Sequence, residues 1–251
     1  LRDEGVDRIY NVYLPQEHFT LFEGHLRDRV FPEFDGVVAT SEFTRVLGRA
    51  NLEANEGVDE DAGIAAAAYE NDVPVFVPAV QDSVLGIQAW MHSQVSSFTL
   101  DALADLTTIT DVAFDAEKAG ATVVGGGVPK NFVLQTMLTV PEAYDYGVQL
   151  TTDPASTGGL SGATLDEARS WGKLEKSAKN VTVLGDATIT LPLLVAGARD
   201  RLSPPVRRFQ RLLFTDDGWV GRVDAAYDLD SWLFGLWERL LRAERRRLSA
   251  E

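Results

Sequence analysis

Residues 121–127 read Ala-Thr-Val-Val-Gly-Gly-Gly, a short apolar run that ends in three glycines. The run predicts a buried strand, and the helical pattern over 129–140 predicts that the glycines turn the chain into a helix. Backbone without side chains at a helix start lets a phosphate approach the amide N–H groups. The usual dinucleotide spacing is not met, because its third glycine falls at Lys130. A simple tight turn therefore stays an equal alternative.

Strand and helix patterns alternate on both sides of this turn. Apolar runs at 73–77, 147–151 and 181–184 predict further buried strands, the first at a sheet edge because it contains a proline. Helical patterns lie between the strands at 100–119 and 165–173. Regular strand–helix–strand succession predicts right-handed crossovers. We therefore expect a doubly wound, mostly parallel α/β sheet of the Rossmann type with helices on both faces.

Ligands of such sheets bind beyond the carboxyl ends of the strands. The loops after Val77, Val124, Thr151 and Leu184 are therefore expected to converge on one site. The loop over 151–161 consists of small polar residues, which suit a ribose or a phosphate unless the loop is a flexible surface segment.

Two aspartates follow predicted strand ends. Asp186 comes just after the 181–184 run, and Asp82 lies five residues beyond Val77. Carboxylates in this position often hold ribose hydroxyls or a cationic ligand. Each aspartate has the alternative role of capping the next helix.

The chain divides into two parts of different composition. Residues 1–202 hold the α/β pattern, which opens in mid-pattern and reaches its first clear strand at 36–40, so the early strands of a nucleotide-binding fold are expected to be missing. Residues 203–251 contain nine arginines and no lysine, and they are predicted to form an unrelated helical tail. The segment 229–248 is predicted to be an amphipathic helix that docks on the body, or binds a partner or a membrane surface.

Composition excludes several classes of function. The net charge of -15, from 38 acids and 23 bases, disfavours nucleic acid and anionic membrane as partners. The acid excess with few lysines resembles proteins from cells that keep molar salt, with an ordinary acidic cytosolic protein as the alternative. There is no cysteine, and the three histidines show no zinc spacing, so no metal site is expected. Without a signal peptide or a run of about 18 apolar residues, the protein is expected to be cytoplasmic.

Lysine is rare in this chain and is therefore informative. Only five of the 23 basic residues are lysines, namely Lys118, Lys130, Lys173, Lys176 and Lys179. Arginine keeps its proton in proteins, whereas a desolvated lysine can lose it and act as a nucleophile. Lys173, which closes the run Ser-Trp-Gly-Lys, is the candidate nucleophile.

Glu167 and Trp171 share the predicted helix end with Lys173. The two residues are four positions apart and so lie on one helix face. An indole beside a carboxylate suits a desolvated cation, and a lysine next to that cation is favoured in its neutral amine form, ready to form an imine. The alternative is that Glu167 and Lys173 are solvated helix charges and Trp171 is a core residue.

Five stretches together resemble the deoxyhypusine synthase family, and the resemblance covers residue 1 to about residue 202. They are Val-Pro-Val-Phe-Val-Pro-Ala (73–79), Gly-Gly-Gly-Val-Pro-Lys (125–130), Asp-Tyr-Gly-Val-Gln-Leu-Thr-Thr (145–152), Asp-Glu-Ala-Arg-Ser-Trp-Gly-Lys (166–173) and Asp-Ala-Thr-Ile-Thr-Leu-Pro-Leu-Leu-Val-Ala (186–196). The Ser-Trp-Gly-Lys block is the most specific of these, and the glycine triplet supports it.

The resemblance implies an NAD-dependent aminobutyl transferase. In that family NAD takes a hydride from spermidine, and the aminobutyl group passes to an active lysine as an imine with loss of diaminopropane. The group then passes to one lysine of the translation initiation factor 5A precursor, where reduction by the retained NADH completes deoxyhypusine. The family also implies a homotetramer with active sites at subunit interfaces.

The resemblance assigns roles to individual residues. Lys173 matches the imine-forming lysine, and Trp171 and Glu167 match the polyamine-site tryptophan and acid. Gly158 and Asn131 fall at further substrate-binding positions. Positions that contact NAD in the family correspond here to Asp82, Gly126, Thr152, Asp153, Ser161, Asp186 and Ala187.

The chain departs from the family pattern at the amine site and at its front. Ile87 and Leu160 stand where other members carry two polyamine-binding aspartates, and Asn131 replaces a histidine. Fewer carboxylates weaken the hold on a multiply charged amine, so agmatine or another short amine is an alternative donor to spermidine. By the same resemblance, the amino-terminal half of the NAD site is expected to be missing. The alternatives are therefore a homospermidine synthase-like transfer to a free polyamine, and an incomplete fragment or half of a split enzyme.

Overall fold

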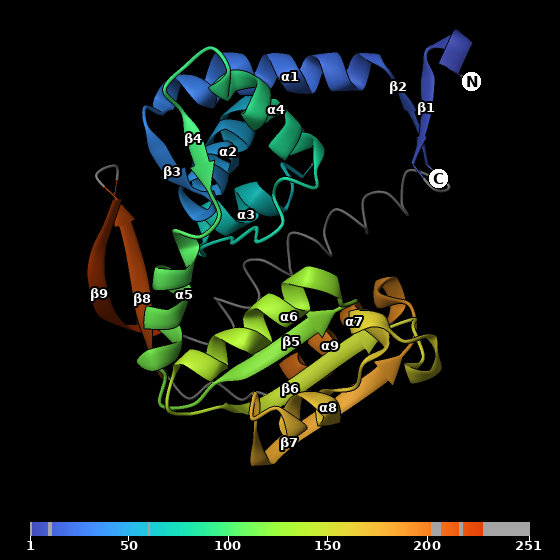
Figure 1. Ribbon diagram of the computed structural model, residues 1–251, viewed down its shortest axis with the longest axis vertical. Coiled ribbons are helices and arrows are strands. Elements are labelled where there is room, and N and C mark those ends of the chain that lie inside the picture. Colours follow the sequence, from blue (N-terminus) through green and yellow to red (C-terminus); the bar gives the residue numbers. More distant parts are fainter. Residues whose placement is uncertain (1, 10–11, 60, 202–206, 216–217, 228–251) are drawn as a thin grey trace.

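The computed structural model describes residues 2–9, 12–59, 61–201, 207–215 and 218–227. Figure 1 shows an amino-terminal lobe of helices around a two-stranded sheet and a carboxy-terminal lobe built on a three-stranded sheet. Helix α5 (Asp105–Phe114) lies between the two lobes. The protein is therefore a mixed α/β fold with parallel sheets, as the alternation of patterns predicts.

The amino-terminal lobe is a small parallel sheet covered by helices. Strand β3 (Val37–Ala39) pairs with β4 (Thr99–Asp101) in parallel. The elements before β3 are η1 (Arg2–Glu4), β1 (Val6–Ile9), β2 (Val12–Pro15), α1 (Glu17–Arg29) and η2 (Phe31–Glu33). The helices between the two strands are α2 (Thr40–Ala54), α3 (Ile64–Glu70) and α4 (Val84–Ser93). The antiparallel β1–β2 hairpin projects from the lobe at the far end of α1 (Figure 1).

Aromatic side chains form the core of this lobe. Phe43 on α2 and Phe98 before β4 are fully buried, and their rings lie 6.0 Å apart. Phe31 packs against both, and the ring of His92 on α4 stacks on Phe31 at a centroid distance of 4.2 Å. Such ring pairs contribute about 0.5–1.5 kcal/mol each beyond their buried area. The cluster thus joins α2, α4 and β4.

A buried carboxylate joins α5 to the start of α2. Asp105 is 1% exposed and accepts hydrogen bonds from the backbone N–H groups of Thr40 and Ser41, at 3.1 and 3.2 Å. It also accepts from the hydroxyl groups of both residues, at 2.6 Å for Ser41. These N–H groups belong to the first turn of α2, where no intrahelical acceptor exists. Asp105 therefore caps a helix that begins 65 residues before it.

The carboxy-terminal lobe carries the parallel sheet β5–β6–β7. Its strands are β5 (Gly120–Val124), β6 (Tyr144–Thr151) and β7 (Leu174–Leu184). Val123 lies opposite Gln149, and Gln149 lies opposite Thr182. The helices are α6 (Gly127–Thr136), η3 (Met137–Thr139), η4 (Ala155–Thr157), α7 (Gly159–Gly162), α8 (Leu165–Ser170) and α9 (Ala187–Arg201). Leu134 on α6 and Leu165 on α8 share one core, which holds these two helices against the sheet.

Several sequence predictions are confirmed in this lobe. The predicted strands at 121–124, 147–151 and 181–184 all lie within β5, β6 and β7. The predicted first strand at 36–40 corresponds to β3, and the predicted helix at 129–140 corresponds to α6 with η3. The elements from η1 to η2 were not predicted.

The prediction of a strand at 73–77 is wrong. Within the described residues no strand pairs with this segment, and two of its backbone groups bond to side chains of α2 instead. The hydroxyl group of Thr44 donates to the carbonyl oxygen of Val75 at 2.8 Å, and the N–H of Val77 donates to Thr40 Oγ1 at 2.8 Å. Pro74 also lacks the N–H that a ladder needs. The described residues therefore form two separate parallel sheets, where the sequence predicts a single one.

The helix predicted over 100–119 is shorter than expected. Residues 99–101 form β4, and α5 covers only 105–114. Leu103 and Leu106, two apolar residues of the 100–119 pattern, are 74% and 44% exposed, so they do not form a buried face. Periodicity alone did not show which side of this helix would be covered.

The tail differs from the helical prediction where the structure describes it. Strands β8 (Arg207–Thr215) and β9 (Gly218–Tyr227) form an antiparallel hairpin. The helix predicted at 229–248 lies outside the described residues. Within the described part of the chain, no helix is long and apolar enough to cross a membrane.

Candidate active site

The Ser-Trp-Gly-Lys run forms the turn between α8 and β7. Gly172 has a φ of 75°, and its N–H donates to the carbonyl oxygen of Arg169 at 3.0 Å. The N–H of Lys173 donates to the carbonyl oxygen of Ala168, also at 3.0 Å. This pair of bonds is a Schellman motif, with a glycine at the left-handed position. Lys173 therefore lies directly before β7, whereas the sequence predicts that it ends the helix.

Replacing Gly172 by alanine is expected to destabilise the protein by about 1 kcal/mol, because a Cβ is strained at a left-handed φ. The matched control is Gly24→Ala, in the interior of α1 at an ordinary helical conformation, which is expected to be neutral or stabilising by up to about 1 kcal/mol. Urea unfolding followed by circular dichroism measures both. Equal midpoints for the two variants would contradict the role of Gly172.

The side chain of Lys173 lines a pocket between α6 and the α7–α8 segment. Its Nζ donates a hydrogen bond to Asn131 Oδ1 at 3.0 Å. The pocket is small and open to solvent. Its lining consists of Lys130, Asn131, Leu134, Leu160, Ala163, Thr164, Glu167, Ala168, Trp171 and Lys173. Residues 42 positions apart thus line one hollow.

The structure brings most of the predicted substrate residues together. Lys173, Glu167, Trp171 and Asn131 line the same pocket, and Trp171 is 67% exposed. Gly158 is not part of the lining. It precedes α7 with a φ of 72° and serves as the left-handed residue of that turn.

The two positions where the family pattern has aspartates lie far apart in the fold. Leu160 lines the pocket, so this chain has an apolar side chain where the family pattern has a carboxylate. Ile87 is on α4 in the amino-terminal lobe and is 52% exposed. Glu167 is the carboxylate in the lining of the pocket.

Lys130 is a pocket residue that the sequence analysis did not select. It is 5% exposed, and its Nζ donates to Gln149 Oε1 at 3.1 Å and to the carbonyl oxygens of Leu160 and Ala163 at 2.8 and 2.5 Å. Burial lowers its pKa from the usual lysine value, Glu167 acts in the opposite direction, and Lys173 lowers it further. The rarity of lysine was the available signal, and it was applied to Lys173 alone.

Most of the predicted cofactor residues lie at the carboxyl edge of β5–β7. The N–H of Gly125 donates to the carbonyl oxygen of Leu150, and the N–H of Gly185 donates to that of Thr151, so the three strand ends are adjacent. Six of the seven predicted NAD contacts follow these strand ends or lie in the loop between them. They are Gly126, Thr152, Asp153, Ser161, Asp186 and Ala187. Three of the four loops predicted to converge, those after β5, β6 and β7, thus meet at one sheet edge, whereas the loop after Val77 lies in the amino-terminal lobe.

Gly126 packs against protein backbone. A Cβ at this position would lie 2.4 Å from the Cα of Ser161, so only glycine allows the 158–163 loop to approach. Gly125 and Gly127 have left-handed φ values of 79° and 74°, and a Cβ on Gly125 would meet nothing within 4 Å. At the start of α6, the backbone that other residues leave uncovered is therefore that of Gly125 and Gly127.

The two strand-end aspartates differ in their surroundings. Asp186 Oδ1 accepts hydrogen bonds from the N–H and the hydroxyl group of Thr188, at 2.8 and 2.7 Å, and these bonds lower the pKa of Asp186. Its capping alternative is therefore realised at the start of α9. Asp82 is exposed and lies before α4 in the amino-terminal lobe, where Ser83 caps the helix instead. The structure places Asp82 apart from the other six.

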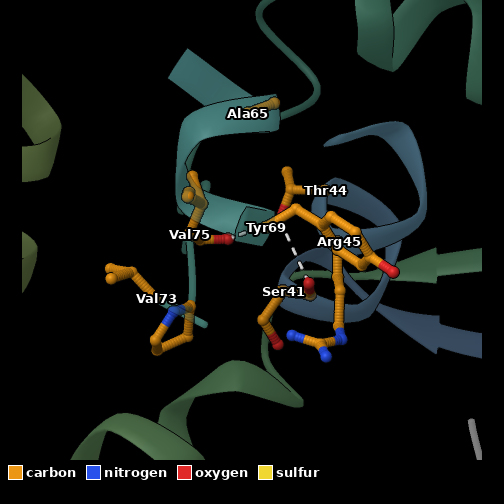
Figure 2. Close-up of a pocket in the computed structure, with 9 residues that line it drawn as sticks. Ser41, Thr44, Arg45, Ala65, Tyr69, Val73 and Val75 are labelled. Atoms are coloured by element: carbon orange, nitrogen blue, oxygen red, sulfur yellow. Dashed lines mark hydrogen bonds between the residues drawn. The ribbon is translucent and has the colours of Figure 1, made fainter. Parts of the chain in front are cut away.

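A second hollow lies between α2, α3 and residues 73–75, and Figure 2 shows it. Arg45 there pairs with Asp72 at 2.7 Å and lies over the ring of Tyr69 at 5.2 Å. The hydroxyl group of Thr44 bonds to Val75 across it (Figure 2). Ser41, Thr44 and Arg45 in this hollow all have hydrogen-bond partners in the protein, and the hollow contains none of the predicted site residues. It is a groove between packed elements of the amino-terminal lobe.

Comparison with known sequences agrees with the residues gathered at this site. The family model described as deoxyhypusine synthase matches residues 1–198. The chain belongs to the deoxyhypusine synthase family. It is 49% identical over 204 residues to a probable deoxyhypusine synthase of Methanosarcina thermophila, covering 81% of this chain and 62% of the relative. It is 42% identical over 201 residues to probable deoxyhypusine synthase 1 of Archaeoglobus fulgidus, covering 80% and 63%.

The match to the family is partial in length. The chain spans about three fifths of the length of these curated relatives. A second family model, a domain of unknown function (DUF8116), matches residues 185–251 and so includes α9 and the tail. The pocket around Lys173 and the carboxyl edge of β5–β7 both lie within the deoxyhypusine synthase match.

Proposed function

We propose that this chain carries the imine-forming site of a deoxyhypusine synthase, an NAD-dependent transferase. It would move the aminobutyl group of spermidine, or of a related amine, to a lysine of the translation initiation factor 5A precursor. One observation carries the proposal: Lys173 Nζ bonds to Asn131 in a pocket that also holds Glu167 and Trp171. An amine nucleophile beside a carboxylate and an indole is the chemistry that transfer of an alkylamine through an imine requires.

Three residues of the pocket have roles in this proposal. Glu167 would pair with the ammonium end of the donor, and the Trp171 ring would cover it. Lys173, as a neutral amine, would attack the oxidised carbon of the donor. The bond from that carbon to diaminopropane then breaks, the proton lost by Lys173 leaves with diaminopropane, and the aminobutyl group stays on Lys173 as an imine. The acceptor lysine displaces Lys173 in the same way, which restores the free amine.

The carboxyl edge of β5–β7 suits a dinucleotide. NAD, when bound, would accept the hydride of the donor and return it to the final imine. Thr152 and Asp153 are exposed there, and the backbone of Gly125 is open at the start of α6. Gly126, Ser161, Asp186 and Ala187 complete this edge, and Asp82 would reach the cofactor only from the amino-terminal lobe.

The proposal extends to the assembly and the location of the protein. It includes the homotetramer that the resemblance implies, a cytoplasmic location, and a doubly wound sheet with helices on both faces in the carboxy-terminal lobe. The net charge of -15 supports a protein and an amine as partners over nucleic acid or an anionic membrane.

The test uses the whole chain with NAD, spermidine and the factor 5A precursor, quenched with borohydride and mapped by peptide mass spectrometry. We expect an aminobutyl group on one lysine of the factor, release of diaminopropane, and a trapped adduct on Lys173. Omitting the factor and finding an enlarged free polyamine would favour the homospermidine-type reaction. Absence of any adduct and any product would contradict the proposal.

A further inference from the structure

The buried ammonium group of Lys130 is bonded at all three of its hydrogens. Its acceptors are Gln149 Oε1 on β6 and the carbonyl oxygens of Leu160 and Ala163, which flank the end of α7. An ammonium group has three donors and no acceptor, so these bonds saturate it. A lysine in this state presents no lone pair to a substrate.

The same polar network holds the 158–163 loop to the sheet. Gln149 is fully buried, and its Nε2 donates to the carbonyl oxygens of Gly125 and Ser161, at 3.2 and 3.0 Å. The hydroxyl group of Thr151 donates to the carbonyl oxygen of Ser161 as well, at 3.2 Å. The loop is thus bonded to β6 and, through Lys130, to α6.

This loop is the wall shared by the two proposed halves of the site. On one side Leu160 and Ala163 line the amine pocket. On the other side Ser161 packs on Gly126 at the carboxyl edge of the sheet. A shift of the loop would therefore change the shape of the amine pocket and the edge that would hold the cofactor.

We propose that Lys130 is a positioning residue, which fixes the 158–163 loop and thereby the wall of the amine pocket, and that it is not a second imine-forming amine. The amine-binding part of this inference rests on the function proposed above. Although Lys130 and Lys173 line one pocket, they have different roles: Lys173 reacts, and Lys130 holds the wall of the pocket in position.

Deprotonation of Lys130 is opposed by its own bonds. Burial lowers the pKa of Lys130. A neutral amine, however, has only two hydrogens to donate, so losing the proton would leave one of three buried oxygens without its donor. The buried acceptors therefore stabilise the charged form of Lys130 and oppose the effect of desolvation.

The first test is Lys130→Met, which keeps the length of the side chain and removes the charge and all three donors. Amide hydrogen exchange of residues 158–163 is expected to become about tenfold faster, since bonds to a buried charged group are lost. The matched control is Lys176→Met on the exposed part of β7, which should leave exchange in the loop unchanged. Unchanged exchange in Lys130→Met would overturn the proposal.

A second measurement separates binding from reaction. Wild type and Lys130→Met are incubated with a short ω-amino aldehyde, which forms an imine with loss of water, and the imine is trapped by cyanoborohydride. We expect the half-saturating aldehyde concentration to rise about tenfold in the variant while the maximum rate of labelling at Lys173 is retained. A variant that loses the maximum rate with an unchanged half-saturating concentration would show that Lys130 takes part in the reaction itself.

A third measurement needs only the wild-type protein. A general amine-acylating reagent should label Lys176 rapidly and Lys130 at least about a hundredfold more slowly, because reaction at Lys130 first requires the loop to open. Labelling of Lys130 as fast as Lys176, or an imine adduct on Lys130, would overturn the proposal. If no lysine is trapped by the aldehyde, the proposed function fails, and hydrogen exchange in the 158–163 loop still decides the positioning role.

Discussion

Lys173→Ala is expected to abolish the borohydride-trapped adduct and, with it, all transfer to an acceptor lysine. The reason is that little free energy is needed to break the hydrogen bond that holds the Lys173 amine, so this amine can react. Its Nζ bonds to Asn131 at the edge of an open hollow. Lys130, in contrast, is saturated by three buried oxygens. A second lysine in the pocket therefore does not replace the first.

The measurement is intact-mass and peptide mass spectrometry after incubation with a short ω-amino aldehyde and cyanoborohydride. This probe enters the imine step directly and needs no cofactor. The matched control is Lys176→Ala, which removes a lysine three positions along β7 on an exposed part of the strand. Its labelling at Lys173 should equal that of the wild type. An adduct that persists in Lys173→Ala at a single other lysine would remove Lys173 from its role.

Three residues of the pocket around Lys173 could be predicted because their signal is local. Glu167, Trp171 and Lys173 lie within seven positions, on one turn that a glycine ends. Apolar runs that end in glycine or small polar residues likewise fix β5, β6 and β7. Where a pattern is contained in about ten residues, the short-range geometry of helix and strand is enough to place the side chains.

Contacts between distant segments could not be predicted in the same way. The 73–77 segment has the composition of a strand, but whether it finds a ladder partner depends on the hydroxyl groups of Thr40 and Thr44, more than 30 positions earlier. The role of Gly126 has the same origin. Its missing side chain admits Ser161, 35 positions later, rather than a phosphate. Periodicity within one segment carries no information on which distant group satisfies a backbone N–H.

Asp105→Ala is expected to lower the free energy of unfolding by about 3 kcal/mol. The substitution leaves the N–H groups of Thr40 and Ser41 and both hydroxyl groups buried without their acceptor, and each hydrogen bond to a charged group contributes about 1.5–3 kcal/mol. It also removes a negative charge from the positive end of α2. Not all of this is lost, because the hydroxyl groups can turn toward other acceptors.

The control for this prediction is an aspartate with only a local bond. Asp101 accepts from the N–H of Leu103 at 2.8 Å, two residues along the chain, in an exposed turn. Asp101→Ala is expected to cost at most about 1 kcal/mol. Urea unfolding by circular dichroism compares the two variants with the wild type. If Asp105→Ala unfolds at the same midpoint as Asp101→Ala, the cap from α5 does not hold α2, and the start of α2 must be stabilised by its own side chains, with Glu42 bonding back to the N–H of Ala39.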